Sequence, residues 1–155
     1  MTRNLTWDEY GLLIAQTVSL KSKDPSTKVG ALILGPDKQP LSFGFNGFPR
    51  GVKDLPERYA DRNVKYAFVA HAERNAIDLC SARPKGATLY LNRPFVCKEC
   101  AKSIVQSGIT RVVVNAGNTF GSGTQNIWSD DAIVTETIFK EAGVIFDKIT
   151  LPEGI

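Results

Sequence analysis

The chain has 155 residues, which is long enough to bury a core and short enough for one domain, so we expect residues 1–155 to form a single domain. Apolar residues make up 43% of the sequence and charged residues 23%, values that argue against a disordered chain. The net charge of +3 argues against an extended nucleic-acid surface but suits a small anionic ligand.

No apolar run approaches the roughly 18 residues that a membrane-spanning helix needs, so no membrane association is expected. Residues 1–10 lack the apolar stretch of a signal peptide. Three cysteines without an export signal indicate a reducing compartment, where thiols bind metals or take part in catalysis. We therefore expect a cytoplasmic protein.

The first part of the chain is predicted to be a helix followed by a hairpin. Residues 5–22 carry apolar side chains at helical spacing, with Thr6 as N-cap and Glu9 three residues later. Residues 27–35 and 39–47 are predicted strands joined by a tight turn. Residues 47–66 are polar and turn-rich, and we interpret them as an excursion from the sheet.

The remainder alternates helices with strands. Helices are predicted over residues 71–82, 97–108 and 129–143, and strands over residues 86–92, 109–115 and 144–149. Ser129 is expected to cap the last helix and Gly143 to end it. Strand–helix–strand units pair in parallel through right-handed crossovers, whereas the hairpin adds an antiparallel edge. The predicted fold is α/β, a three-layer α/β/α sandwich with a five-stranded mixed sheet.

Three side chains at predicted helix starts have the chemistry of zinc ligands. Cys97 and Cys100 are three residues apart on a first helical turn, so both sulfurs lie on one side, and His71, the single histidine, opens another helix. The partial positive charge of a helix N-terminus favours the thiolate, which is the form that binds metal. Three protein ligands, rather than four, are typical of a catalytic zinc, which lowers the pKa of a bound water toward roughly 7.

Glu73 follows His71 by two residues and therefore projects in a different direction, beside the metal without ligating it. A carboxylate there could move a proton from water to a substrate. Taken alone, His71 would be interpreted as a helix cap, and the Cys-x-x-Cys pair as a redox or structural motif. Together, His-x-Glu followed by Cys-x-x-Cys is the signature of zinc deaminases. The third cysteine, Cys80, is interpreted as a core thiol.

At this point the sequence resembles the deoxycytidylate (dCMP) deaminases of the cytidine deaminase superfamily over nearly its whole length. The resemblance lies in "SKDPSTKVGALI", "GFNGFPRG", "HAERNAI", "CKECAKSIVQSGI" and "IFKEAGV". It implies a cytidine deaminase-like fold and the zinc-dependent hydrolysis of dCMP to dUMP and ammonia. It also implies zinc on His71, Cys97 and Cys100, with Glu73 as the proton shuttle.

The resemblance implies substrate contacts at Asn46 and Ala72. Asn46 stands between Gly44 and Gly47, which would allow a ligand to approach closely, and an amide both donates and accepts hydrogen bonds. Hydroxyl and ammonium groups of the loop ahead of the first strand are candidates for binding the 5′-phosphate. These candidates are Ser22, Thr27 and Lys28.

Two features depart from the family pattern. Val96 stands where the family usually has proline before its first cysteine, which concerns the shape of the pocket rather than metal binding. The Gly-rich segment 115–128 is longer than the resemblance leads us to expect. Its aromatic residues, Phe120 and Trp128, would either close over the base or pack internally.

The resemblance also implies a homo-oligomer, often a hexamer, and allosteric activation by Mg²⁺-bound dCTP with inhibition by dTTP. Residues 47–70 contain neither histidine nor cysteine, so no second zinc is expected there. Apolar residues interleaved with charges in the excursion suit either a subunit interface or packing against the parent domain. They are Phe48, Leu55, Tyr59, Tyr66 and Phe68.

Two alternatives stay open. The first is another deaminase of the superfamily, acting on a nucleoside, guanine, a modified dCMP or a base within RNA. A nucleic-acid editor should carry a basic patch and aromatic platforms, which the scattered Lys and Arg residues argue against. The second is a non-catalytic zinc or nucleotide-binding module, although a structural zinc normally has a fourth protein ligand.

Overall fold

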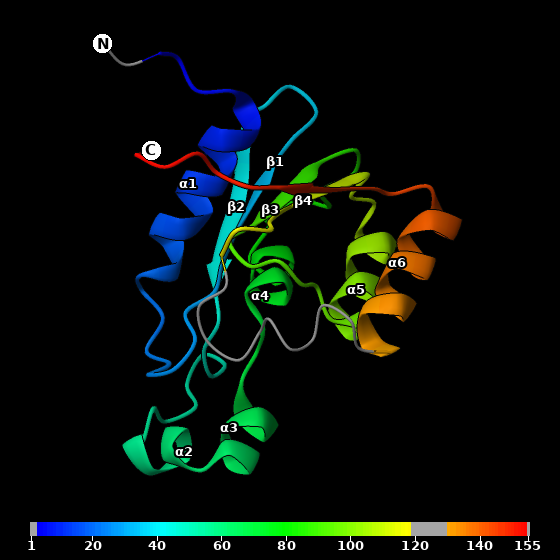
Figure 1. Ribbon diagram of the computed structural model, residues 1–155. Helices are drawn as coiled ribbons and strands as arrows, with labels where there is room; N and C mark the ends of the chain where they lie inside the picture. Colours follow the sequence, from blue (N-terminus) through cyan, green and yellow to red (C-terminus); the bar gives the residue numbers. More distant parts are fainter. Residues whose placement is uncertain (1–2, 119–129, 155) are drawn as a thin grey trace.

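The computed structural model describes residues 3–118 and 130–154 (Figure 1). The helices are α1 Trp7–Ser19, α2 Pro56–Ala60, α3 Arg62–Phe68, α4 Ala72–Asp78, α5 Lys98–Ser107 and α6 Asp130–Ala142. The strands are β1 Gly30–Leu34, β2 Pro40–Phe45, β3 Thr88–Leu91, β4 Arg111–Asn115 and β5 Ile145–Ile149. The interpretations of Phe120, Trp128 and the cap at Ser129 fall outside the described residues.

The strands form one five-stranded mixed sheet in the order β2-β1-β3-β4-β5. Strand β1 is antiparallel to both of its neighbours, β2 and β3, whereas β3, β4 and β5 run parallel to one another. The hairpin therefore forms the antiparallel edge, and the strand–helix–strand units form the parallel part, as the sequence predicted.

The helices cover both faces of the sheet, which makes the predicted α/β/α sandwich (Figure 1). Strand side chains alternate between the two faces. On one face, α1 packs through Leu12 and Ala15 against Leu32, Tyr90 and Val113. On the other, α4, α5 and α6 enclose the larger cluster, which includes Ala76, Ile104, Phe139, Leu89 and Val112. None of the helices among the described residues has both the length and the apolarity needed to cross a bilayer.

Helix α1 starts at the predicted capping box. The Thr6 hydroxyl accepts a hydrogen bond from the Glu9 N–H at 3.1 Å, and the Glu9 carboxylate accepts one from the Thr6 N–H at 2.9 Å. The helix is tied to the sheet by Asp8, whose two oxygens lie 2.8 Å from the Arg111 guanidinium. The hydrogen bond from Arg111 is the main reason that the pKa of Asp8 is lowered.

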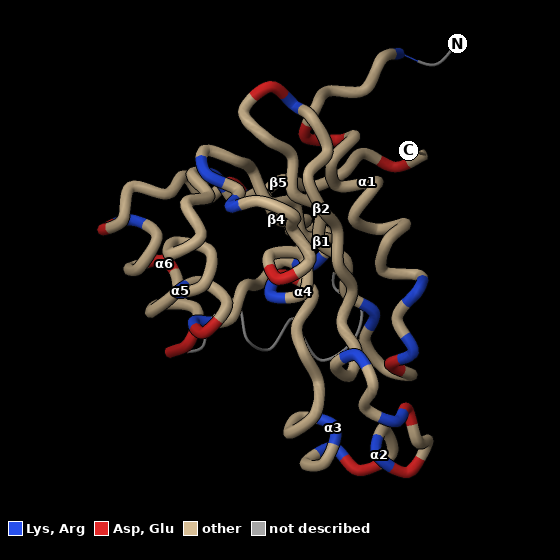
Figure 2. Tube along the Cα trace, turned by 180° about the vertical axis from the view of Figure 1, so that it is seen from behind, with Lys and Arg blue, Asp and Glu red and all other residues tan. Residues whose placement is uncertain are grey.

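The segment interpreted as an excursion from the sheet, residues 47–66, contains helix α2 and most of helix α3, which the sequence analysis did not predict. Helix α3 begins at Asp61, whose carboxylate accepts hydrogen bonds from the N–H groups of Asn63 and Val64. The rings of Phe48 and Tyr59 stack at 4.2 Å, and Phe68 lies 5.7 Å from Phe48. Both helices project beyond one end of the sheet; α2 carries charges of both signs, whereas the charged residues of α3 are basic (Figure 2).

Helix α4 is shorter than predicted, because it ends at Asp78 rather than at residue 82. Beyond it the chain turns toward the C-terminal end of α5. There, the Arg83 guanidinium donates hydrogen bonds to the carbonyl oxygens of Ser107 and Gln106, at 3.1 and 2.9 Å. These tertiary contacts outweigh the helical pattern of residues 79–82.

Candidate active site

The three predicted zinc ligands lie together. His71 Nδ1 is 3.3 Å from Cys97 Sγ and 3.4 Å from Cys100 Sγ, and the ligand atoms of the three residues are within 4.8 Å of one another. A tetrahedral zinc with Zn–N and Zn–S bonds of about 2.0–2.3 Å has N···S edges of roughly 3.6 Å. The two nitrogen–sulfur distances are therefore close to those of a zinc site with an open fourth position.

Local structure explains the arrangement. His71 is the extended N-cap residue of α4, and Cys97 is the extended N-cap residue of α5. Cys100 lies in the first turn of α5, and its N–H donates a hydrogen bond to Cys97 Sγ at 3.3 Å. The starts of two packed helices therefore present the ligands to one point.

The three ligand side chains shift one another's pKa values through their mutual hydrogen bonds. The pKa of Cys97 is lowered to about 4 by hydrogen bonds from the Cys100 thiol and from His71. The same bond to Cys97 raises the pKa of His71 to about 9. The pKa of Cys100 is raised, because it shares its proton with Cys97 and is buried. These directions favour the thiolate at Cys97, which is the form that binds metal.

Glu73 stands beside this cluster and outside the ligand group. It lies in the first turn of α4, is only 4% exposed and lines the same pocket as His71 and Cys97. Burial raises the pKa of its carboxyl group, against the opposing charge of His71. A buried carboxyl with a raised pKa next to a metal site is suited to accepting and returning a proton.

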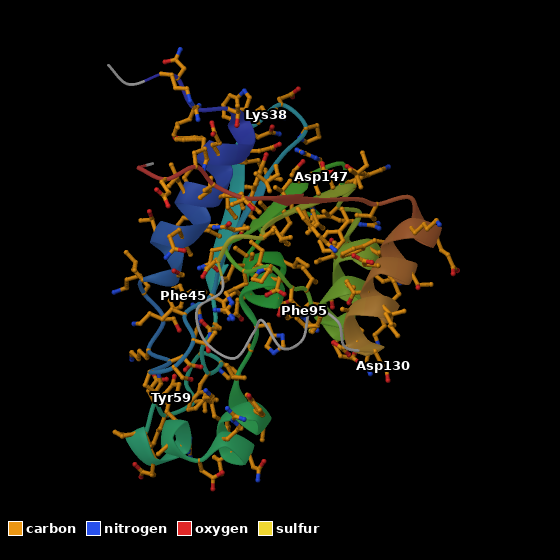
Figure 3. The ribbon with its side chains drawn as sticks, in the orientation of Figure 1. Lys38, Phe45, Tyr59, Phe95, Asp130 and Asp147 are labelled. Atoms are coloured by element: carbon orange, nitrogen blue, oxygen red, sulfur yellow. The ribbon has the colours of Figure 1, made fainter. Side chains whose placement is uncertain are left out.

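The site opens into a cavity of about 680 Å³, within the usual range of a small-molecule pocket. Its walls come from the loop after α1, the end of β2, helix α3, the start of α4 and the segment between β3 and α5. The lining residues beyond the ligands include Thr27, Asn46, Arg62, Lys65, Tyr66, Ala72, Arg93, Phe95 and Asp131. Figure 3 labels Phe95 in the segment that approaches α5.

Helix α3 gives one face to the pocket, which the sequence interpretation missed. Arg62, Lys65, Tyr66 and Val69 line it at helical spacing, and that spacing was the available signal. Lys65 Nζ donates a hydrogen bond to Ser26 Oγ at 2.9 Å and pairs with Asp24 at 3.3 Å, so this helix also fixes the loop ahead of β1.

Three of the predicted substrate residues, Asn46, Thr27 and Ala72, line the pocket, whereas Ser22 and Lys28 do not. The buried Ser22 hydroxyl donates to the Asn46 carbonyl oxygen at 2.9 Å, and Lys28 Nζ donates to the Ser22 carbonyl oxygen at 2.7 Å. The Ser22 hydroxyl and the Lys28 ammonium group therefore stabilise the loop through backbone hydrogen bonds.

The Asn46 amide also forms hydrogen bonds with the backbone of this loop. Its Oδ1 accepts from the Val29 N–H and its Nδ2 donates to the Thr27 carbonyl oxygen, both at 2.9 Å. An amide has a second N–H and a second acceptor position, so Asn46 retains capacity for a ligand.

Gly44 serves helix packing, so its interpretation as a site of close ligand approach is corrected. A Cβ atom on Gly44 would lie 2.5 Å from the Ala76 nitrogen and 2.8 Å from the Ala72 oxygen, both in the backbone of α4. At Gly47, a Cβ atom would meet nothing within 4 Å. Cys80 packs against the core, as interpreted.

Three ligands with one coordination position left open, next to a buried carboxyl group at the base of a pocket, define a zinc-dependent hydrolase on an α/β/α scaffold. Sequence comparison specifies the family. Residues 5–116 match the family described as "Cytidine and deoxycytidylate deaminase zinc-binding region", and the chain belongs to this family.

Curated relatives and solved structures agree with this assignment. The chain is 38% identical over 152 residues to "Deoxycytidylate deaminase" of Mus musculus, covering 94% of this chain and 81% of the relative. It is 37% identical over 150 residues to "Deoxycytidylate deaminase" of Homo sapiens, covering 93% of this chain and 80% of the relative. The crystal structure of apo dCMP deaminase from cyanophage S-TIM5 shares the fold, with a TM-score of 0.68 and 23% identity over 92% of this chain and 96% of that chain.

Proposed function

We propose that residues 1–155 form one zinc-dependent deaminase domain that hydrolyses dCMP at C4, converting dCMP and water to dUMP and ammonia. The observation that carries the reaction is the His71–Cys97–Cys100 cluster with Glu73 beside it at the base of the pocket. The nucleotide substrate is supported by the relatives, whose names are those of deoxycytidylate deaminases.

His71, Cys97 and Cys100 would hold the metal, and zinc, when bound, supplies a Lewis acid that brings the pKa of water toward about 7. Glu73 would accept a proton from the attacking water and deliver it to the pyrimidine ring nitrogen. It would then take the second proton from the hydroxyl group now on C4 and deliver it to the departing amino group, which leaves as ammonia. The burial that raises the pKa of Glu73 stabilises the protonated carboxyl between these transfers.

Asn46 and Thr27 are proposed to contact the nucleoside, and Ala72 to lie against the base at the start of α4. For the 5′-phosphate we propose Arg62 and Arg93 in place of Ser22 and Lys28. Both arginines line the pocket, and guanidinium groups bind phosphate through paired hydrogen bonds. Burial lowers the pKa of Arg93 without making it neutral near pH 7.

A comparison of dCMP with deoxycytidine tests this assignment. We expect kcat/KM to favour dCMP in the unmodified protein and Arg62→Ala to reduce that preference by about tenfold or more, since a charge-assisted hydrogen bond contributes about 1.5–3 kcal/mol. Arg50→Ala is the matched control, because Arg50 is exposed and does not line the pocket. Equal kcat/KM values for the two substrates in the unmodified protein would contradict the nucleotide assignment.

A base within RNA is the weaker candidate substrate. In Figure 2, Lys and Arg residues alternate with Asp and Glu over the trace instead of gathering on one face. That distribution supports a small-molecule substrate, because a nucleic-acid surface needs a concentrated positive patch. Activity on oligonucleotides above that on dCMP would reverse this preference.

We also propose that the chain forms a homo-oligomer, with the hexamer implied by its family resemblance. Support comes from Tyr66 and Phe68, which remain 57% and 37% exposed next to the pocket, whereas Phe48 and Tyr59 pack on each other. Light scattering at micromolar concentration tests the proposal. A mass near the 17.0 kDa of one chain would contradict it, and a sixfold mass would support the hexamer.

Allosteric activation by Mg²⁺-bound dCTP, with inhibition by dTTP, is proposed on the family resemblance alone. A shift of the dCMP saturation curve by dCTP that requires Mg²⁺ would support it, and superimposable curves would contradict it. A cytoplasmic location is proposed as well, and it is supported by the three cysteines, all of which are free thiols.

A further inference from the structure

Thr135 makes an unusual bond for a helical threonine. Within helices, a threonine hydroxyl commonly bonds to the carbonyl oxygen four residues earlier. Thr137 does so to Ile133 at 2.8 Å, and Thr17 does so to Leu13 at 3.0 Å. The hydroxyl of Thr135, which is only 1% exposed, instead donates to the Val96 carbonyl oxygen at 2.8 Å, outside its own helix. This bond fixes the residue immediately before the ligand Cys97.

Asp131 makes a complementary bond on the other side of the same ligand. Its Oδ2 accepts a hydrogen bond from the Lys98 N–H at 3.2 Å, and its Oδ1 lies 3.4 Å from Lys98 Nζ. Asp131 and Thr135 are four residues apart, so they lie on one face of α6. That face meets the start of α5, and the two helices lie side by side in Figure 1.

Figure 3 labels two residues that adjoin these hydrogen-bonding partners in the sequence. Phe95, one residue before Val96, and Asp130, one residue before Asp131, lie at the same end of the α5–α6 pair. The chain between β3 and α5 has no regular secondary structure over residues 92–96. Val96 also lacks the ring that would fix its φ angle. External hydrogen bonds must therefore hold this segment in place.

We propose that Asp131 and Thr135 are positioning residues that hold the backbone on both sides of Cys97 and thereby fix its sulfur for zinc. Cys97 is the N-cap residue of α5, so its Sγ position follows directly from the backbone at Val96 and Lys98. Releasing either bond lets Sγ move away from its position 3.3 Å from His71 Nδ1. The proposal rests on the zinc site of the proposed function and is independent of the substrate.

The experiment measures zinc release in the absence of any substrate. The zinc-loaded protein is mixed with a chromogenic chelator, and the rate of metal transfer is followed. We expect Thr135→Val and Asp131→Ala each to release zinc about tenfold faster, since loss of a partner that orients a ligand commonly costs 10- to 100-fold in metal affinity. The Co²⁺-substituted variants should also show shifted d–d absorption bands.

Matched controls separate positioning from general helix stability. Thr137→Val removes a hydroxyl bonded within the same helix, and Asp130→Ala removes the neighbouring exposed carboxylate. Both should keep the zinc-release rate of the unmodified protein. Thr135→Ser keeps the hydroxyl and should restore slow release. If Thr135→Val fails to fold, Asp131→Ala still tests the proposal, because the Asp131 side chain is 31% exposed.

Zinc release at the unmodified rate from both Thr135→Val and Asp131→Ala would overturn the proposal. So would equal acceleration in the two controls, because the effect would then belong to helix stability in general. An unmodified protein that binds no zinc would overturn the proposed function itself, which is a separate outcome. With zinc restored in excess, the KM for dCMP should be unchanged in Thr135→Val, because Thr135 does not line the pocket.

Discussion

Gly44→Ala should displace the helix that carries His71 and Glu73. Strand β2 approaches α4 so closely at Gly44 that an added Cβ would lie 2.5 Å from the Ala76 nitrogen, about 0.9 Å short of ordinary contact at 3.4 Å. The obstructing atoms belong to the backbone, so no side-chain rotation relieves the clash. Helix α4 or strand β2 must move by a large part of that distance.

The size of the effect follows from the position of the site. His71 and Glu73 lie at the start of α4, and a displacement of about 1 Å at a catalytic group commonly costs on the order of 100-fold in rate. Overpacking should also lower the free energy of unfolding by about 1–3 kcal/mol. The assays are kcat/KM for dCMP and urea unfolding at pH 7.

Gly47→Ala is the control for Gly44→Ala. A Cβ atom on Gly47 meets nothing within 4 Å, so this variant should stay within about 0.5 kcal/mol of the unmodified stability. Gly47 does not line the pocket, in contrast to the ligand approach interpreted from the sequence, so activity should stay within about twofold. A Gly44→Ala protein with unmodified activity and stability would refute the reasoning. It would show that α4 and β2 separate at no cost to the site.

Three further predictions concern protonation. Glu73→Gln should bind zinc yet lose about 10²- to 10⁴-fold in turnover, and an active variant would exclude the shuttle role. The pKa of His71 without zinc is about 9, so zinc must displace the His71 proton when it binds. Zinc affinity should therefore rise at least tenfold per pH unit between pH 6 and 8. Zinc binding should also release protons, which an indicator dye detects. Arg111 lowers the pKa of Asp8, so the stability that ionised Asp8 contributes is present above its unfolded pKa of about 3.9. This contribution is lost as the pH falls through the folded pKa of Asp8. In urea unfolding, Arg111→Ala should therefore destabilise the protein more at pH 7 than at pH 3.

The sequence predicted those features that depend on local chemistry. The capping box at Thr6 and Glu9 needs residues only three apart, and the hairpin needs a turn between two short apolar strands. The zinc ligands could be inferred from residue type and spacing, although their meeting point depends on the packing of α4 against α5.

The features that the sequence did not predict depend on contacts between residues far apart in the chain. Lys65 reaches the pocket wall because it pairs with Asp24, 41 residues earlier. Ser22 and Lys28 had suitable chemistry for a phosphate, but their polar atoms bond to the backbone of their own loop and its neighbour. Gly44 allows close packing between β2 and α4, a tertiary contact that local sequence does not reveal.

The most direct test is the conversion of dCMP by metal-free protein and by the same preparation reloaded with one equivalent of zinc. The reloaded protein should produce dUMP and ammonia in equal amounts, while the metal-free protein should be inactive until zinc is added, because His71, Cys97 and Cys100 form the metal site. Equal rates in the two samples, or a zinc-loaded protein that leaves dCMP unchanged, would contradict the account.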